Sequence, residues 1–107
     1  AVSTVVCKMD DHHAIIDAGS KTLTTDLCGH RPGYGWVVGH PEIRITKLNE
    51  EHGFVESDEP LPFEIGDKIA IIPNHACVLP NLVDKIYGIR NGRIERMIPI
   101  EARGRYL

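Results

Sequence analysis

The chain has 107 residues, a formal net charge of −3 and 42% hydrophobic residues. This length suits one domain with its own hydrophobic core, and the charge offers no basic surface to attract nucleic acid or an anionic membrane. The sequence has no apolar run long enough to span a bilayer and no signal-peptide pattern, so we expect a cytoplasmic protein.

The N-terminal segment 1–7 is already rich in β-prone residues, and no initiator methionine, cap or linker precedes it. We therefore expect the chain to be a domain cut from a longer protein, with part of the chemistry in the missing portion. Three cysteines, Cys7, Cys28 and Cys77, form an odd and sparse set. A chain of this size folds without disulfides, so we expect reduced thiols.

Short apolar runs separated by Gly, Pro, Asn and Asp predict a mainly β fold, a single barrel-like or sandwich-like domain over residues 1–107. A short helical turn is expected after the strand that leads to the candidate metal ligands. The expected strands are Val2–Lys8, Ala14–Asp17, Lys21–Thr25, Trp36–Val38, Ile43–Asn49, Gly53–Glu56, Lys68–Ile72, Lys85–Arg90 and Arg93–Ile98.

Three short segments allow more specific predictions. The dipeptide Asn91-Gly92 between β-prone residues predicts a hairpin with a two-residue type I′ turn, which places Arg90 opposite Arg93. The apolar run 69–72 lacks alternation, so we expect both faces of its strand to be covered. The Gly-rich segment 28–35 lacks the spacing of a phosphate-binding loop and is given no nucleotide role.

The strongest chemical signal follows the apolar run, where His75 and Cys77 are separated by one residue. In an extended segment, residues i and i+2 share a face, so both side chains can bind one metal ion. An imidazole with a thiolate suits zinc better than magnesium or calcium. The other interpretation is structural, because a buried cysteine behaves as a small hydrophobe and histidine often only satisfies a carbonyl.

Further side chains offer alternatives to this two-ligand site. Cys28 and His30 repeat the same spacing and, together with His75 and Cys77, would make a closed structural zinc site without catalysis. Asp17 follows an apolar strand and is either a turn cap or a carboxylate that orients a metal ligand or the substrate without binding the metal itself. The remaining histidines are expected in polar turns or exposed: His12, His13, His40 and His52. Nucleophilic catalysis by Cys77 is poorly supported, because no suitably placed base or oxyanion hole is apparent.

Several segments resemble, in the same order, the C-terminal domain of the D-serine dehydratase family. This group includes the D-threonine aldolases and belongs to the alanine-racemase-like, fold-type III pyridoxal-phosphate (PLP) enzymes. The resemblance covers nearly the whole chain and is carried by residues 14–21 (AIIDAGSK) with Asp26, by Gly66-Asp67, and by residues 72–77 (IPNHAC) with Asn81-Leu82.

The resemblance implies a two-domain enzyme, in which an N-terminal α/β barrel carries the cofactor lysine and the C-terminal β domain supplies metal ligands and helps to form a homodimer. Only the β domain is present, so no catalytic residue is assigned in this chain, and Lys21 is not the cofactor lysine. In this family, a His-x-Cys pair is typical of dehydratase-like members and a His-x-Asp pair of aldolase-like ones. His75 and Cys77 therefore imply zinc that assists loss of the β-hydroxyl of a D-amino acid.

Two other functions stay open at this point. One is an aldolase-type lyase acting on D-threonine or 3-hydroxyaspartate. The other belongs to a different class: a stand-alone β-barrel binding module with a structural Cys/His zinc site. For a dehydratase-type or an aldolase-type lyase, the expected partners are the barrel domain of the same enzyme and a D-amino acid. The isolated chain is then expected to be inactive.

Overall fold

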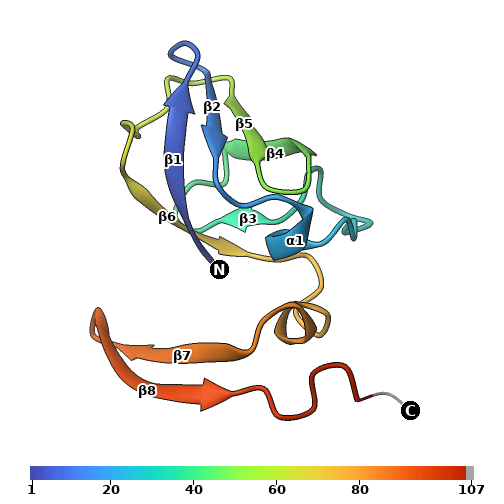
Figure 1. Ribbon diagram of the computed structural model, residues 1–107. Helices are drawn as coiled ribbons and strands as arrows, with labels where there is room; N and C mark the ends of the chain where they lie inside the picture. The colour runs from blue at the N-terminus through green and yellow to red at the C-terminus, as the bar shows by residue number, and fades with distance from the viewer. Residues whose placement is uncertain (106–107) are drawn as a thin grey trace. The chain divides into compact units, whose positions relative to one another are not determined.

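The computed structural model describes residues 1–105 and shows two compact units, Ala1–His75 and the residues from Ala76 onward. Each unit is built mainly of antiparallel strands (Figure 1). The first unit contains β1 (Val2–Lys8), β2 (His13–Ile16), α1 (Ser20–Leu23), β3 (Trp36–Val37), β4 (Ile43–Leu48), β5 (Gly53–Ser57) and β6 (Lys68–Ile72). The second contains the 3-10 turn η1 (Leu79–Leu82), β7 (Lys85–Arg90) and β8 (Arg93–Pro99).

The first unit is a six-stranded sheet in the order β3-β6-β1-β2-β5-β4, and its edge strands β3 and β4 contact each other. The sheet therefore curls into a nearly closed barrel. Strand β1 joins its two halves, because Val2 pairs with Ala70 of β6 while Val5 pairs with Ile16 of β2. The mainly β class, the barrel and the short helical turn expected from the sequence are confirmed.

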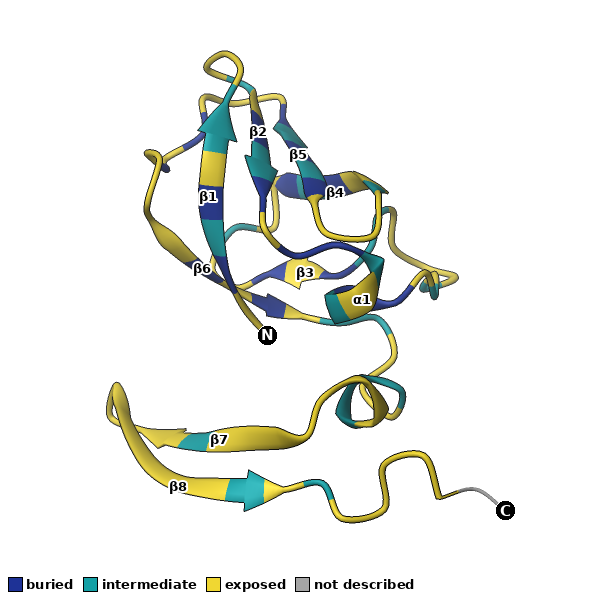
Figure 2. Cartoon of the chain, in the orientation of Figure 1, coloured by how far each residue is buried: buried dark blue, intermediate teal, exposed yellow. Residues whose placement is uncertain are grey.

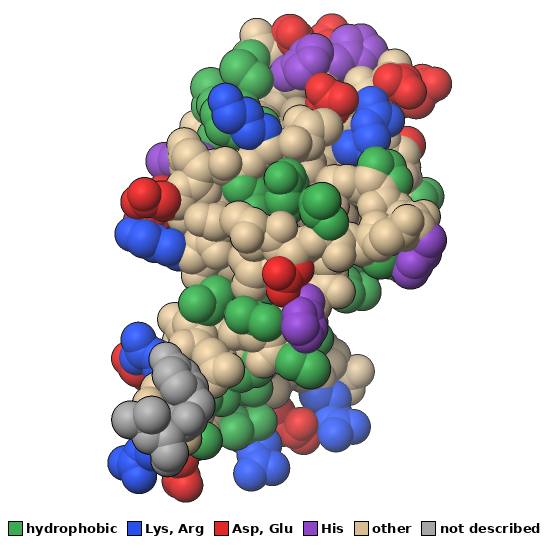
Figure 3. Space-filling view, turned by 90° about the vertical axis from the view of Figure 1, so that its right-hand side faces the viewer, with side chains coloured by type: hydrophobic (Ala, Val, Ile, Leu, Met, Phe, Trp, Pro, Cys, Tyr) green, Lys and Arg blue, Asp and Glu red, His purple; other side chains and the backbone are tan. Residues whose placement is uncertain are grey.

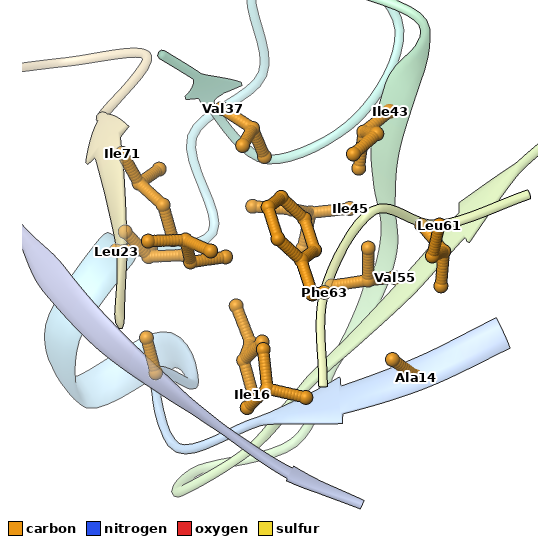
Figure 4. Packing of buried hydrophobic residues seen from close by; sticks show 13 residues of the cluster. Ala14, Ile16, Leu23, Val37, Ile43, Ile45, Val55, Leu61, Phe63 and Ile71 are labelled. Carbon is orange, nitrogen blue, oxygen red and sulfur yellow. The ribbon is translucent and has the colours of Figure 1, made fainter. Parts of the chain in front are cut away.

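Apolar side chains from opposite sides of the barrel fill its interior. The side chains of Ile16, Ile45 and Ile71 come from three different strands and are almost completely buried, and Leu23 joins them from α1 (Figure 4). Figure 2 shows that the buried residues lie in the barrel and that the second unit is coloured as exposed or intermediate. The barrel thus holds the hydrophobic core of the described residues.

Strand β6 differs from its prediction. Its burial alternates, with Ile69 and Ile71 facing the core while Ala70 and Ile72 are exposed. The expectation that both faces are covered is wrong for residues 1–105, because one face of β6 packs on the barrel core and no described element covers the other. An apolar run without alternation did not require two buried faces here.

The segment predicted as a strand at Lys21–Thr25 is instead the short helix α1, so that prediction is wrong. The amide of Leu23 donates to the carbonyl of Gly19, and the amides of Ser20 and Lys21 donate to the carbonyls of Asn49 and Glu50. These distant carbonyls cap the helix start and override the β preference of the threonines. Among residues 1–105, no helix has the length and apolar character needed to cross a bilayer.

Asp17 fastens the end of β2 to the start of β1. Its Oδ1 accepts hydrogen bonds from the Ser3 hydroxyl and the Thr4 amide, both at 2.7 Å. The bond from the Thr4 amide, followed by that from Ser3, lowers the pKa of the Asp17 carboxyl. Ser3 is itself buried, so the carboxylate also satisfies a hydroxyl that would otherwise lack a partner.

In the second unit, β7 and β8 form the predicted hairpin. Asn91 and Gly92 have φ values of 51° and 75°, as a type I′ turn requires, and Arg90 pairs with Arg93. Both the turn and the register expected from the sequence are confirmed. The like charges are eased by Glu95, whose carboxylate accepts from Arg90 Nε at 3.1 Å.

The hairpin has one apolar face. Tyr87 and Ile89 are alternate residues of β7 and share a face, and they pair with Met97 and Ile94 of β8. A register shift between Gly88 and Ile89 accommodates the extra residue of β8 between these two pairs. All four are about half or more exposed. A two-stranded hairpin is only marginally stable by itself in water, so this apolar face suits association with another surface.

The hydrogen bonds of Asp17 predict a contribution to acid stability. Since its pKa is lowered in the folded state, its stabilisation is present above the ordinary aspartate pKa of about 3.9 and is lost as the pH falls through the lower folded value. Asp17→Asn should lower the free energy of unfolding at pH 7 by about 1 kcal/mol, a figure reduced for solvent exposure. Urea titrations from pH 7 to pH 2 test this, and the variant should lose less stability on acidification. Parallel pH profiles for the two proteins would contradict it.

Candidate metal site

His75 and Cys77 follow the end of β6 without continuing it. The strand ends at Ile72, His75 lies three residues later, and Cys77 occupies a turn over 76–78 that leads into η1. The expectation that both side chains project from one face of an extended segment is therefore wrong. Their closeness in the chain remains, and both residues are exposed.

The imidazole of His75 is held by a carboxylate. Its Nδ1–H donates to Asp26 Oδ2 at 2.9 Å, and about half of each side chain is exposed. This bond fixes the orientation of the ring and leaves Nε2 directed elsewhere. A carboxylate on the far nitrogen is the usual support of a histidine that binds a metal, since it orients the ring and raises the basicity of the other nitrogen.

The side chain of Asn74 holds the loop of Asp26 against the segment that carries His75. Its side-chain amide donates to the carbonyl of Asp26 at 3.0 Å and to that of Gly33 at 2.9 Å. The amide of Asp26 in turn donates to Thr24 Oγ1. The loop that carries Asp26 is thus tied to the residue that precedes His75, so the hydrogen bond between Asp26 and His75 joins two restrained segments.

Asp26 was the residue that reasoning from the amino-acid pattern did not place at the site. It is 49 positions from His75 in the chain, and only the family resemblance included it among the expected residues. No local spacing brings these two residues together. The polar Asn74 between Pro73 and His75 gave no signal either, because its partners are backbone carbonyls of a distant loop.

Cys28 and His30 form a separate pair within the first unit. Cys28 Sγ lies 3.5 Å from Nδ1 of His30, in a loop closed by a bridge between Cys28 and Arg31. No group of three or more His, Cys, Asp or Glu side chains gathers at metal-binding distances within residues 1–105. Within the first unit, Cys28, His30 and His75 therefore do not form such a group, and the closed four-residue site stays a prediction.

The other histidines lie away from His75 in structural contacts. At the turn between β1 and β2, His13 Nδ1 donates to Asp10 at 2.8 Å. His12 in the same turn contacts the carbonyl of Ser57 at the end of β5. The His12 amide, followed by the His13 side chain, lowers the pKa of the Asp10 carboxyl. Figure 3 shows histidine and acidic side chains gathered at the end of the barrel that carries this β1–β2 turn.

Two further expectations about histidines have different outcomes. His52 is exposed, as expected for its turn. His40 is half-buried and packs its ring edge against Phe63 with 5.0 Å between centroids, so the expectation of an exposed His40 is wrong. For Asp17, the described contacts are those to β1, and a role towards a ligand stays a prediction.

The chain matches known proteins over most of its length. The family described as "Putative serine dehydratase domain" matches residues 1–89. An uncharacterized protein of Mycobacterium tuberculosis is 34% identical over 97% of this chain and 79% of that protein. The 3-hydroxy-D-aspartate aldolase of Paracoccus denitrificans is 31% identical over 97% of this chain but only 25% of the enzyme.

Solved structures share the fold. The D-threonine aldolase of Filomicrobium marinum superimposes with a TM-score of 0.86 and 28% identity over 99% of this chain and 28% of that chain. A cysteine-to-alanine mutant of D-threo-3-hydroxyaspartate dehydratase in the metal-free form superimposes with a TM-score of 0.76 and 24% identity over 92% of this chain and 31% of that chain. This chain therefore belongs to the serine dehydratase domain family, whose enzymes contain the domain as about a quarter of their length.

Proposed function

We propose that this chain is the metal-binding β domain of a PLP-dependent D-amino acid lyase of the dehydratase type, with His75 and Cys77 as its zinc ligands. The observation that carries the proposal is the 2.9 Å contact between His75 Nδ1 and Asp26. It leaves Nε2 free to bind a metal on a ring whose orientation is already fixed. The thiol of Cys77 is exposed and not part of a disulfide, as a second ligand requires.

Two protein ligands would make an open site. With two ligands from this chain, the remaining zinc positions would be taken by water, by substrate or by another part of a longer enzyme. When bound, zinc would act as a Lewis acid towards the β-hydroxyl of a D-amino acid, while PLP held by a separate barrel domain would supply an electron sink.

Four residues of the chain have a defined task in this proposal. His75 and Cys77 bind the metal, Asp26 orients and polarises His75, and Asn74 fixes the loop on which Asp26 lies. The metal-free form recorded for the related dehydratase supports a metal in that enzyme. Zinc is favoured here because a thiolate is a soft ligand, whereas carboxylate ligands suit harder ions.

The apolar face of the hairpin supports a place within a larger enzyme. Tyr87, Ile89, Ile94 and Met97 present a surface that a barrel domain or a second subunit of a homodimer would cover. The aldolase relatives contain about three times as much chain outside the match as within it. This extra length is enough for an α/β barrel of about 250 residues.

Two specific observations favour other candidates. The similarity to a 3-hydroxy-D-aspartate aldolase and a D-threonine aldolase favours an aldolase-type lyase, in which the same domain would bind a metal beside a different bond to be broken. The mycobacterial relative has only about a fifth of its length outside the match, which favours a stand-alone binding module. Metal binding and cofactor chemistry separate these candidates.

Zinc binding by variants tests the assigned ligands. Purified chain should bind one zinc ion, and His75→Ala and Cys77→Ser should each lose it, since a single remaining ligand holds zinc weakly. Cys28→Ser is the matched control and should retain zinc. Calorimetry and metal analysis measure the stoichiometry, and the charge-transfer band of a cobalt-substituted sample reports a thiolate ligand. Loss of zinc in the Cys28 variant would instead support the closed structural site.

The role of Asp26 has its own variant. Asp26→Asn should lower zinc affinity about 10- to 100-fold, because the amide orients His75 less well and does not raise its basicity. Asp17→Asn serves as a control that removes a carboxylate with contacts to β1 alone among those described here. Competition with a fluorescent zinc chelator measures both affinities. Equal weakening by the two substitutions would contradict a special role of Asp26 and would favour Asp17 as a carboxylate that also orients a ligand.

The absence of a cofactor lysine can be tested directly. After incubation with PLP and reduction with borohydride, intact-mass measurement should show no stoichiometric attachment, because the lysines here belong to the metal domain. The chain alone should also release no keto acid from D-serine. Attachment of one PLP at a single lysine would contradict the division of labour between the two domains.

A further inference from the structure

A second candidate site lies in the loop between α1 and β3. The backbone of this loop is packed tightly, since a Cβ on Gly33 would lie 2.8 Å from the carbonyl oxygen of Ile45, and one on Gly35 would lie 3.0 Å from Ile71 and the Ile72 carbonyl. Both glycines have positive φ, at 87° and 125°. The loop is therefore held in one shape between β4 and β6.

Beside this loop lies a cavity of about 170 Å³ that is open to solvent. Two guanidinium groups, an indole ring and aliphatic walls line it: Arg31, Arg44, Trp36, Pro32, Pro41 and Ile43. A cavity of this size holds more than one water molecule and admits a short side chain or a small organic acid.

Arg31 is oriented by Trp36. Its guanidinium carbon lies 4.3 Å from the centroid of the indole ring, and within residues 1–105 no acidic side chain approaches it within 4.0 Å. A stacked guanidinium keeps its in-plane N–H donors available. The group is thus pre-organised to bind a planar anion through two parallel hydrogen bonds.

The ion pairs of Arg44 limit the charge that a ligand of this cavity can carry. Arg44 contacts Glu56 at 3.4 Å and Asp58 at 3.2 Å through one nitrogen, Nη2, which leaves Nη1 and Nε out of both ion pairs. The two arginines and these two carboxylates together carry no net charge. Both carboxylates pair with Arg44, and no carboxylate pairs with Arg31 among residues 1–105. A single carboxylate pairs with Arg31 alone, whereas a dianion such as phosphate would bring a second negative charge near Glu56 and Asp58.

We propose that this cavity binds a monocarboxylate that carries a small apolar group. The carboxylate pairs with the guanidinium of Arg31, and the apolar group packs on Pro32, Pro41 and Ile43. Two sources share this chemistry: a free short-chain organic acid, or the C-terminal carboxylate of a polypeptide that ends in an apolar residue. The inference does not rest on zinc or on PLP, and it holds for any of the functions considered above.

The chain provides a reporter for this site, because Trp36 is its only tryptophan. Titration with 4-methylpentanoate should change the Trp36 fluorescence in a saturable way, and the neutral amide of the same acid should bind at least tenfold more weakly. Acetate and inorganic phosphate should also bind more weakly, since acetate lacks the apolar group and phosphate carries extra charge. A peptide that ends in leucine distinguishes the two sources, and the same peptide with an amidated C-terminus is its control. Tighter binding of the peptide with a free C-terminal carboxylate than of 4-methylpentanoate points to a polypeptide. Weaker binding of that peptide points to a small molecule.

Variants identify the residues involved. Arg31→Gln should weaken 4-methylpentanoate binding at least tenfold, whereas Lys47→Gln, which removes a positive charge from the same strand as Arg44, should not. Circular dichroism and thermal unfolding check that both variants are folded, and ¹⁵N chemical-shift mapping on the unaltered chain tests the location independently of any substitution. Equal affinity for acid and amide, unchanged binding by the Arg31 variant, or shifts that map outside residues 31–44 would each overturn the proposal.

Discussion

The side-chain amide of Asn74 is the interaction on which the functional part of this chain depends. By donating to the carbonyls of Asp26 and Gly33, it closes a loop against the end of β6. One side of that loop carries the carboxylate that orients His75, and the other side carries Arg31 and the glycines that shape the neighbouring cavity. Both candidate sites thus rely on one polar side chain that has no direct role in either.

Much of the fold could be predicted from local patterns. The strands agree with alternation and with turn residues, and the hairpin follows from the dipeptide Asn91-Gly92 because few other pairs accept two positive φ values. Helix α1 could not be predicted, since its first amides depend on carbonyls that lie 29 positions further along the chain. The burial of β6 was misjudged because composition alone does not say whether a second layer covers the outer face.

The candidate site was predicted only in part, for a similar reason. The spacing of His75 and Cys77 predicts a metal site, but the side chain that orients His75 is Asp26, which is far away in the sequence. A shared strand face does not position these two side chains. His75 is instead oriented by its hydrogen bond to Asp26, and Cys77 exposes its thiol in the following turn. The candidate site therefore combines a short motif with a contact between loops that are distant in the sequence.

The pairing of β1 with β6 has a consequence for how the chain folds. Val2 pairs with Ala70, so the barrel can close only after nearly all of the first unit has been synthesised. Such non-local pairing raises the contact order and slows folding to a timescale of about milliseconds to seconds, whereas a hairpin such as β7–β8 forms in about 1–10 μs. On the ribosome, β1 and β2 therefore wait as an unfinished edge until β6 emerges, and during that interval the chain is most exposed to aggregation and to chaperones.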